Sequence, residues 1–340
     1  MKAADWWHVL GDGRVLCELC PRSCRLGEGQ RGYCHARRME GGSLITDAYG
    51  VSSGFCVDPI EKKPLFHFHP GSQVLSFGTR GCNLGCSFCQ NWSLSRGQPM
   101  LHATRPEDIV RMALAQDCRG VAFTYNEPII SIEFCIEVAL ACHEAGLITV
   151  AVSAGYISDK AREAFFEVMD AANVDLKGFS EAFYRDYCGG SLAPVLETLA
   201  YLAHRKRTWL EVSTLLIPGA NDGEAELETQ ARWMLEHLGP DVPLHLNAFH
   251  PDYKLQDRPR TPLGTLHRAR ESAESEGVRY VYLGNVRDED GSSTWCHVCG
   301  RCLIERDGFE VSSLDLMRGA CPECGTPLAG HFGVAGVKKV

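Results

Sequence analysis

The grouping of the cysteines constrains this chain more than any other feature of its sequence. Of the 17 cysteines in 340 residues, 13 fall into three groups. Their C-x2-C and C-x3-C spacings favour thiolate–metal sites, because disulfide frameworks are typical of short secreted chains. The groups are Cys17, Cys20, Cys24, Cys34 and Cys56; Cys82, Cys86 and Cys89; and Cys296, Cys299, Cys302, Cys321 and Cys324. The other four lie in apolar stretches and are expected to be small buried side chains: Cys118, Cys135, Cys142 and Cys188.

The composition bounds the class of protein. Hydrophobic residues make up 45% of the chain, which is enough for a large buried core. The formal charge of −9 gives no positive field that would attract a nucleic-acid backbone, so we expect no nucleic-acid partner. The N-terminal sequence lacks the long apolar segment of a signal peptide, and no run of 18 apolar residues occurs. We therefore expect a cytoplasmic protein with no membrane partner.

Residues 73–286 alternate short β-branched runs with helical stretches, which indicates βα units on a parallel sheet. Six or seven such units fall short of the eight that close a barrel. We therefore predict an α/β fold with an open, partial (β/α)6 barrel of the TIM-like kind. The expected strands are 73–78, 120–125, 147–153, 173–177, 209–217, 242–249 and 278–283.

Two cysteine-rich segments flank the predicted barrel. Residues 1–72 show no clear periodicity, so we expect a metal-binding N-terminal extension whose order depends on bound metal. Residues 287–295 are charged and then small and polar, which is typical of a linker. The sequence thus predicts three units: the extension 1–72, the barrel 73–286 and a C-terminal module 287–340.

The central cysteines directly follow the first expected strand, in a loop at the carboxyl end of the barrel, where sites of this fold class are built. Cys82, Cys86 and Cys89 have C-x3-C-x2-C spacing. Three thiolates on one loop can bind three irons of a [4Fe–4S] cluster and leave the fourth iron open. The alternatives are a zinc site that lacks one ligand and a fortuitous group.

This spacing, with Phe88 as the aromatic residue before the last cysteine, resembles the signature of the radical SAM superfamily. The resemblance implies that the open iron chelates the amine and carboxylate of S-adenosylmethionine, and that Phe88 lies at this cofactor. It also implies an acidic motif at the end of the second strand, which holds the methionine amine. Asn126 and Glu127 occupy that position, although the sequence departs from the common Gly-Gly-Glu form.

Later strand ends carry further candidates. Ser153 ends the third strand and is expected to contact the cofactor. Asp175 and Lys177 resemble the Asp-x-Lys motif of pyruvate formate-lyase activating enzymes, which implies that they face the cofactor and serve catalysis; a strand-end salt bridge is the alternative. His250 is a catalytic candidate or a loop-capping histidine, and Asn285 is placed to approach the adenine.

The segments 58–68, 81–92, 123–128 and 174–179 together resemble radical SAM enzymes of the AmmeMemoRadiSam system, over roughly residues 15–335. The resemblance implies an electron donor such as flavodoxin or ferredoxin, and partners among the products of the associated genes. Its motifs concern the cofactor and do not identify a substrate.

The N-terminal cysteines Cys17, Cys20, Cys24 and Cys34 supply four thiolates, enough for a closed zinc site or an auxiliary iron–sulfur cluster. Cys56 stands apart as a fifth ligand, a redox-active thiol or a buried residue. The neighbouring run of Glu61, Lys62 and Lys63 is expected to be solvated, with a substrate-facing role as the alternative.

The C-terminal cysteines form two C-x2-C-Gly knuckles separated by 21 residues, a pattern typical of a zinc ribbon. The predicted ligands are Cys296, Cys299, Cys321 and Cys324, with Cys302 outside the site. A rubredoxin-like iron uses the same four thiolates. We expect zinc, because nothing nearby suggests electron delivery.

These motifs predict an enzyme that reductively cleaves S-adenosylmethionine to a 5′-deoxyadenosyl radical, which abstracts hydrogen from a substrate. A non-protein substrate is expected, because the two metal-nucleated extensions could cover the barrel mouth. One alternative is an activase that installs a glycyl radical on a partner protein. Another is a non-catalytic metal-binding adaptor.

Overall fold

An eight-stranded sheet organises the computed structural model, which describes residues 2–333. Its order is β16-β15-β14-β13-β12-β11-β9-β8, and every neighbouring pair from β9 to β16 is parallel. Seven of the eight strands are therefore parallel, and each strand predicted from the sequence overlaps one of them. They are β9 (Gln73–Phe77), β11 (Gly120–Phe123), β12 (Ile148–Ser153), β13 (Ala171–Asp175), β14 (Trp209–Leu216), β15 (Leu244–Ala248) and β16 (Val281–Gly284).

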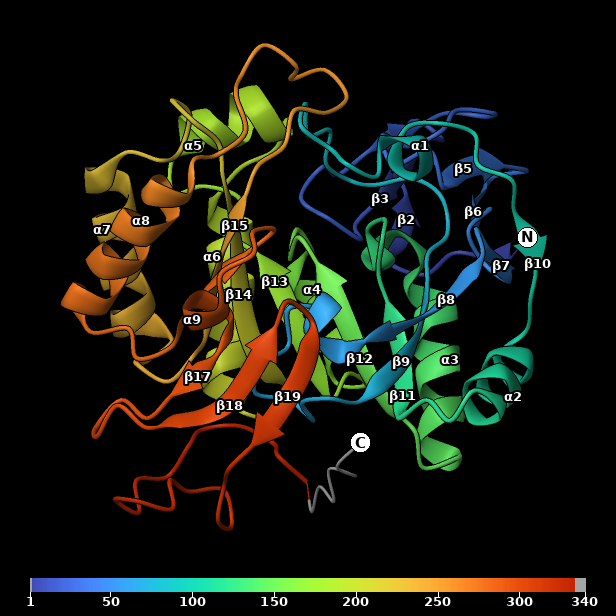
Figure 1. Cartoon of the computed structure of the whole chain (residues 1–340). Coiled ribbons are helices and arrows are strands. Elements are labelled where there is room, and N and C mark those ends of the chain that lie inside the picture. The colour runs from blue at the N-terminus through green and yellow to red at the C-terminus, as the bar shows by residue number, and fades with distance from the viewer. Residues whose placement is uncertain (1, 334–340) are drawn as a thin grey trace.

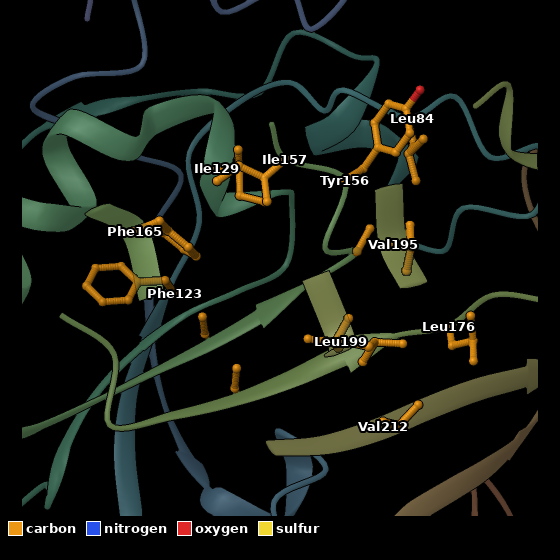
Figure 2. Packing of buried hydrophobic residues seen from close by; sticks show 14 of the residues in the cluster. Leu84, Phe123, Ile129, Tyr156, Ile157, Phe165, Leu176, Val195, Leu199 and Val212 are labelled. Atoms are coloured by element: carbon orange, nitrogen blue, oxygen red, sulfur yellow. The ribbon is translucent and has the colours of Figure 1, made fainter. Parts of the chain in front are cut away.

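Six crossovers join these strands, as the partial barrel requires, and within residues 2–333 the edge strands β16 and β8 do not pair, so the barrel is open. The longer crossover helices are α2 (Pro106–Ala115), α3 (Ile132–Glu144), α4 (Asp159–Phe166), α6 (Ala193–Arg205), α7 (Glu224–His237) and α8 (Leu263–Glu276). Their apolar faces pack on the sheet and remove apolar surface from water. Figure 2 shows part of this core, including Phe123, Phe165, Val195, Leu199 and Val212. No helix in the described part of the chain is long and apolar enough to cross a membrane.

Residues before the first parallel strand contribute to the barrel as well. Strand β8 (Phe55–Pro59) pairs antiparallel with β9, and η1 (Ile60–Lys62) follows it. The next residues close the amino end of the barrel, where Leu65 and Phe68 pack with residues that begin the parallel strands. The buried Glu211 carboxylate fixes this segment by accepting the backbone N–H groups of Phe66 and His67, at 3.0 and 2.8 Å.

The rest of the N-terminal extension consists of very short strands. This explains why its sequence shows no periodicity: strands of two to four residues are too short to reveal one. The strands are β1 (Lys2–Ala3), β2 (Trp7–Val9), β3 (Val15–Cys17), β4 (Arg25–Leu26), β5 (Arg37–Glu40), β6 (Ser43–Thr46) and β7 (Val51–Ser52), the last paired with β10 (His102–Ala103).

The C-terminal module lies at the amino end of the barrel. It is a three-stranded antiparallel sheet of β17 (Thr294–Trp295), β18 (Cys302–Asp307) and β19 (Glu310–Leu314), entered through α9 (Glu289–Ser292). Leu303 and Ile304 of β18 pack with Phe66, Tyr280 and Tyr282. Figure 1 shows these strands and α5 (Glu181–Phe183), which follows β13, at opposite ends of the sheet.

This placement corrects one expectation from the sequence. The C-terminal module does not cover the barrel mouth, because its apolar strand residues pack on an aromatic surface at the other end of the sheet. Any cover over the mouth therefore comes from other segments of the chain.

Candidate active site

A cavity opens at the carboxyl ends of the parallel strands. Its volume is about 280 Å³. The structure brings most of the residues predicted from the sequence into its lining, including Cys82, Cys86, Phe88, Cys89, Asn126, Glu127, Asp175, Lys177 and Asn285. Ser153 reaches the site through Glu127, as described below.

The side chain of Asn126 holds the start of the loop that carries Cys82, Cys86 and Cys89, which we call the cysteine loop. Its Oδ1 accepts the backbone N–H of Thr79 at 2.7 Å, and its Nδ2 donates to Thr79 Oγ1 at 3.0 Å and to the Gly81 carbonyl at 2.9 Å. The amide is therefore engaged in positioning the loop, although it also lines the cavity. Gly81 has a φ of +88°, and a Cβ there would lie 2.0 Å from the Cys34 carbonyl oxygen, so only glycine fits.

The far side of the loop is held by η3 (Tyr184–Cys188), a π-helical turn. Backbone N–H groups of Gly85 and Ser87 donate to the carbonyls of Cys188 and Tyr187, each at 2.8 Å. Cys188 also lies beside Cys86 and raises the pKa of that thiol. The sequence predicted Cys188 only as a small buried side chain. It is buried, but it contacts a proposed cluster ligand, and no local sequence signal distinguishes it from the other apolar cysteines.

The three loop thiols fit a cluster held by three protein ligands. They come from one loop, face one cavity, and no fourth cysteine is among the described residues that line it. Burial raises the pKa of Cys82 and of Cys89, and the neighbouring Cys188 together with burial raises the pKa of Cys86 well above its usual value. The metal-free thiols are therefore protonated, and iron would bind as these protons are released.

Glu127 is buried at the cavity wall. Its Oε1 accepts the Ser153 hydroxyl at 2.7 Å, and its Oε2 accepts the Ala154 backbone N–H at 2.8 Å. Burial raises the pKa of this carboxyl group. Ser153 thus acts on the site by fixing the Glu127 carboxylate, whose position at the end of β11 suits an amine ligand.

Asp175 and Lys177 form an ion pair of 2.8 Å at the cavity wall. Burial alone would lower the pKa of Lys177, but the Asp175 carboxylate more than offsets it and raises that pKa well above its usual value. The two sequence-based interpretations are therefore compatible, since the residues form a strand-end salt bridge and also face the cavity.

Sequence reasoning missed two polar residues on the cavity floor. Asn173 on β13 and Ser213 on β14 both line the cavity. Asn173 Oδ1 and Ser213 Oγ are buried without a hydrogen-bond partner among the described residues. Buried polar atoms are normally paired, so these two atoms suit a polar ligand. Their signal was a polar side chain within a strand otherwise rich in apolar residues.

The two weaker candidates separate in the structure. Asn285 lines the cavity, has a φ of +60°, and donates from Nδ2 to the Ala248 carbonyl at 3.1 Å. His250 is exposed and is not among the residues of the cavity lining. The structure therefore does not bring His250 into the site.

The expectation of a solvated charge run at Glu61–Lys63 is wrong for two of its three residues. Lys63 is buried and donates to Asp58 at 2.7 Å, and Glu61 is buried beside Arg306 at 3.6 Å. Each charge is buried because an opposite charge lies next to it. Cys56 is exposed, with its sulfur 3.5 Å from Asp58 Oδ1.

The four predicted ligands of the C-terminal module lie together. The sulfurs of Cys296, Cys299, Cys321 and Cys324 are all within 4.8 Å of one another. The distance is 3.5 Å between Cys296 and Cys324, and 3.6 Å between Cys299 and Cys321. A tetrahedral ion with metal–sulfur bonds of about 2.3 Å separates its ligands by about 3.8 Å, so this geometry suits one metal ion. Cys302 is not part of the group.

Comparisons with known proteins agree with this site. The family model of the radical SAM superfamily matches residues 77–229. An uncharacterized protein of Methanocaldococcus jannaschii is 41% identical over 330 residues, covering 96% of this chain and 98% of that protein. The pyruvate formate-lyase-activating enzyme of Listeria monocytogenes is 25% identical over 169 residues, covering 46% of this chain and 67% of that enzyme.

The fold has a counterpart among solved structures. A radical SAM methyltransferase from Sphaerobacter thermophilus has a TM-score of 0.51 and 17% sequence identity, covering 69% of this chain and 71% of that one. The likeness concerns the fold alone. Because the family match spans the cysteine loop and the strands β11 to β14, the chain carries a radical SAM domain, with homology to the pyruvate formate-lyase activating enzymes.

Proposed function

We propose that this protein reductively cleaves S-adenosylmethionine at a [4Fe–4S] cluster held by Cys82, Cys86 and Cys89, and abstracts hydrogen from a non-protein substrate. The observation that carries the proposal is the shared cavity: three thiols of one loop face the same space as Glu127 and the Asp175–Lys177 pair. The grouping with AmmeMemoRadiSam-system enzymes, the cytoplasmic location and a flavodoxin- or ferredoxin-type electron donor belong to the same proposal.

The cluster and S-adenosylmethionine, when bound, supply a 5′-deoxyadenosyl radical that removes a hydrogen atom. The residues of this chain hold the reactants in place and limit access by water. Glu127 would accept hydrogen bonds from the methionine amine, because its carboxylate is fixed by Ser153 and Ala154. Lys177 and the unpaired atoms of Asn173 and Ser213 would bind polar groups deeper in the cavity.

A strap over the cysteine loop supports a small or medium-sized substrate. The segment 250–262 follows β15 and reaches the loop, where the Lys254 N–H donates to the Ser87 carbonyl at 3.0 Å. In the same segment the ring of Tyr253 stacks on Trp92 at a centroid distance of 5.5 Å. The strap packs on the cysteine loop on that side, which favours a substrate smaller than a folded protein.

The second candidate is an activase that acts on a partner protein. The similarity to the pyruvate formate-lyase-activating enzyme favours it. The position of the C-terminal module away from the mouth also leaves more room there than the sequence suggested.

The proposed cleavage is tested by anaerobic reconstitution followed by measurement of 5′-deoxyadenosine. Cys86→Ala should abolish product formation, because the cluster loses one of its three protein ligands. Cys118→Ala, which removes a buried cysteine outside the cavity, is the matched control and should keep the parent rate. Formation of 5′-deoxyadenosine at the parent rate by Cys86→Ala would refute the site.

The choice between the two substrates is tested by electron paramagnetic resonance after incubation with S-adenosylmethionine, reductant and candidate partner proteins. Our proposal expects no persistent glycyl-type doublet on a partner. Such a doublet would establish the activase instead.

A further inference from the structure

A second cavity lies between the N-terminal cysteines. It is lined by Cys17 at the end of β3, Cys20 and Cys24 between β3 and β4, and Cys34 between β4 and β5. A Cβ built on Gly32 would lie 3.8 Å from the sulfurs of both Cys24 and Cys34, so these two thiols face the same point. The volume of this cavity is about 20 Å³. One water molecule needs ~10–15 Å³ on the same measure, so the side chains leave a real space between the thiols.

The spacing of these four sulfurs differs from that in the C-terminal module. Among the described residues, only the C-terminal four form a group of three or more metal-ligating atoms that all lie within 4.8 Å of one another. The N-terminal sulfurs surround a common space but stand farther apart. One ion draws its ligands to about 3.8 Å from each other. A [4Fe–4S] cluster has a different iron at each sulfur and needs the wider spacing.

A buried cation faces the same cavity. Arg37 is 1% exposed, and it pairs with Glu133 at 2.5 Å and donates to the Asp5 carbonyl at 2.9 Å. Its Nε has no hydrogen-bond partner among the described residues. A buried N–H without an acceptor is costly, and an anionic cluster with sulfur acceptors would satisfy it.

The cavity adjoins the loop that carries Cys82, Cys86 and Cys89. Asn83, within that loop, lines the N-terminal cavity. Arg22, also in the lining, donates to the Asn83 carbonyl. Gly81 also packs closely against the Cys34 carbonyl, so the cysteine loop and the N-terminal cysteine segment lie side by side.

We propose that Cys17, Cys20, Cys24 and Cys34 hold a second [4Fe–4S] cluster, which passes one electron to the cluster of the active site. The electron comes from a low-potential flavin or iron–sulfur donor protein. No bond forms or breaks in the transfer, and the second cluster returns to its oxidised state. The electron-transfer role rests on the proposed function, whereas the cluster itself does not.

The full chain, purified and reconstituted without oxygen, tests the metal assignment directly. The parent should contain about eight irons and about one zinc. About four irons with about two zincs would overturn the proposal. This measurement needs no variant, so it stays decisive even if a variant fails to fold.

Electron paramagnetic resonance of reduced variants then separates the two clusters. Cys82→Ala/Cys86→Ala/Cys89→Ala should keep a [4Fe–4S] signal that S-adenosylmethionine does not change, and Cys20→Ser/Cys24→Ser should lose that signal. Cys142→Ala, a buried cysteine on α3, is the control and should keep both signals. An iron-free triple variant that remains folded would overturn the second cluster. A parent protein that shows the second signal but no signal that responds to S-adenosylmethionine would instead contradict the proposed function.

The same spectra test the placement of the clusters. The fully reduced parent should give a signal broadened by magnetic coupling, and not the sum of the signals of the two variants. A plain sum would show that the clusters lie too far apart for the proposed transfer.

Discussion

Ser213 is the residue that most directly tests whether the cavity floor binds a ligand. Its hydroxyl oxygen is buried without a partner, so removing it breaks no hydrogen bond within the protein. We expect Ser213→Ala to keep the parent's stability and to weaken binding of S-adenosylmethionine about tenfold, or about 1.4 kcal/mol.

Equilibrium binding to the reconstituted protein measures this effect. Ser272→Ala is a matched control, because its hydroxyl is also buried without a partner but lies on α8, outside the cavity. Equal affinities of both variants and the parent would show that Ser213 does not contact the cofactor.

His67 predicts a pH dependence of stability. Burial lowers its pKa from about 6.5 to about 4. The Ala329 carbonyl, 2.6 Å away, must accept a proton from Nδ1, which leaves Nε2 to accept from the Tyr282 hydroxyl at 2.5 Å. The folded protein therefore holds neutral His67, while the unfolded chain takes up a proton below about pH 6.5. The free energy of unfolding should fall as pH drops from about 6.5 to about 4.

Urea unfolding under anaerobic conditions across this range checks the prediction. His67→Gln should flatten the slope between pH 6.5 and 4, whereas His204→Gln, at an exposed histidine, should not. An unchanged slope in His67→Gln would mean that other groups cause the pH dependence.

Residue roles divide into those that the sequence could reveal and those that it could not. The convergence of Cys82, Cys86 and Cys89 on one cavity was predictable because the three residues lie on one short loop. The burial of Lys63 was not, because its partner Asp58 is provided by the pairing of β8 with β9. The contact between Cys86 and Cys188 likewise depends on tertiary packing.

At the scale of elements, the C-terminal ribbon is expected to bind one zinc. Its four sulfurs already stand at the spacing of a single ion, and a closed four-thiolate site leaves no open position for chemistry. Cys299→Ser/Cys324→Ser should lose the zinc and increase hydrogen exchange within residues 294–328, while the parallel strands stay protected. Their apolar contacts do not depend on the metal.

Metal analysis and hydrogen-exchange mass spectrometry measure both effects. Stoichiometric iron with rubredoxin-like absorbance in place of zinc would contradict the assignment. Increased exchange throughout the barrel would contradict the structural independence of the ribbon.

The parallel strands could be located from sequence because each is a short segment rich in apolar residues and bounded by a helical stretch. The N-terminal strands could not, since pieces such as β4 (Arg25–Leu26) are shorter than one period of any pattern. Strand β8 escaped prediction for another reason: it is an antiparallel edge strand, outside the βα alternation.

At the scale of the whole molecule, the position of the two extensions depends on surface complementarity, which spacing does not encode. The aromatic residues Phe66, Tyr280 and Tyr282 direct the ribbon to the amino end of the barrel. The N-terminal extension packs instead against the cysteine loop, where Arg96 donates to the Tyr33 carbonyl at 2.9 Å. The N-terminal extension and the strap 250–262 therefore both contact the cysteine loop or the residues that follow it.

We expect the strap to protect the proposed cluster from oxygen, because the Tyr253 ring stacks on Trp92 and the Lys254 N–H donates to the Ser87 carbonyl in the cysteine loop. Tyr253→Ala removes one ring of this stacked pair. We expect the S-adenosylmethionine-sensitive resonance signal to decay at least about threefold faster after exposure to air, since a loosened strap admits oxygen more often.

His237→Ala is the matched control, because His237 also stacks on a tryptophan, Trp233, at a centroid distance of 4.7 Å, but on α7. Its decay rate should equal that of the parent. Equal rates in all three proteins would show that the strap does not shield the cluster. The strap would then no longer favour a small substrate, and the open mouth would favour a protein substrate.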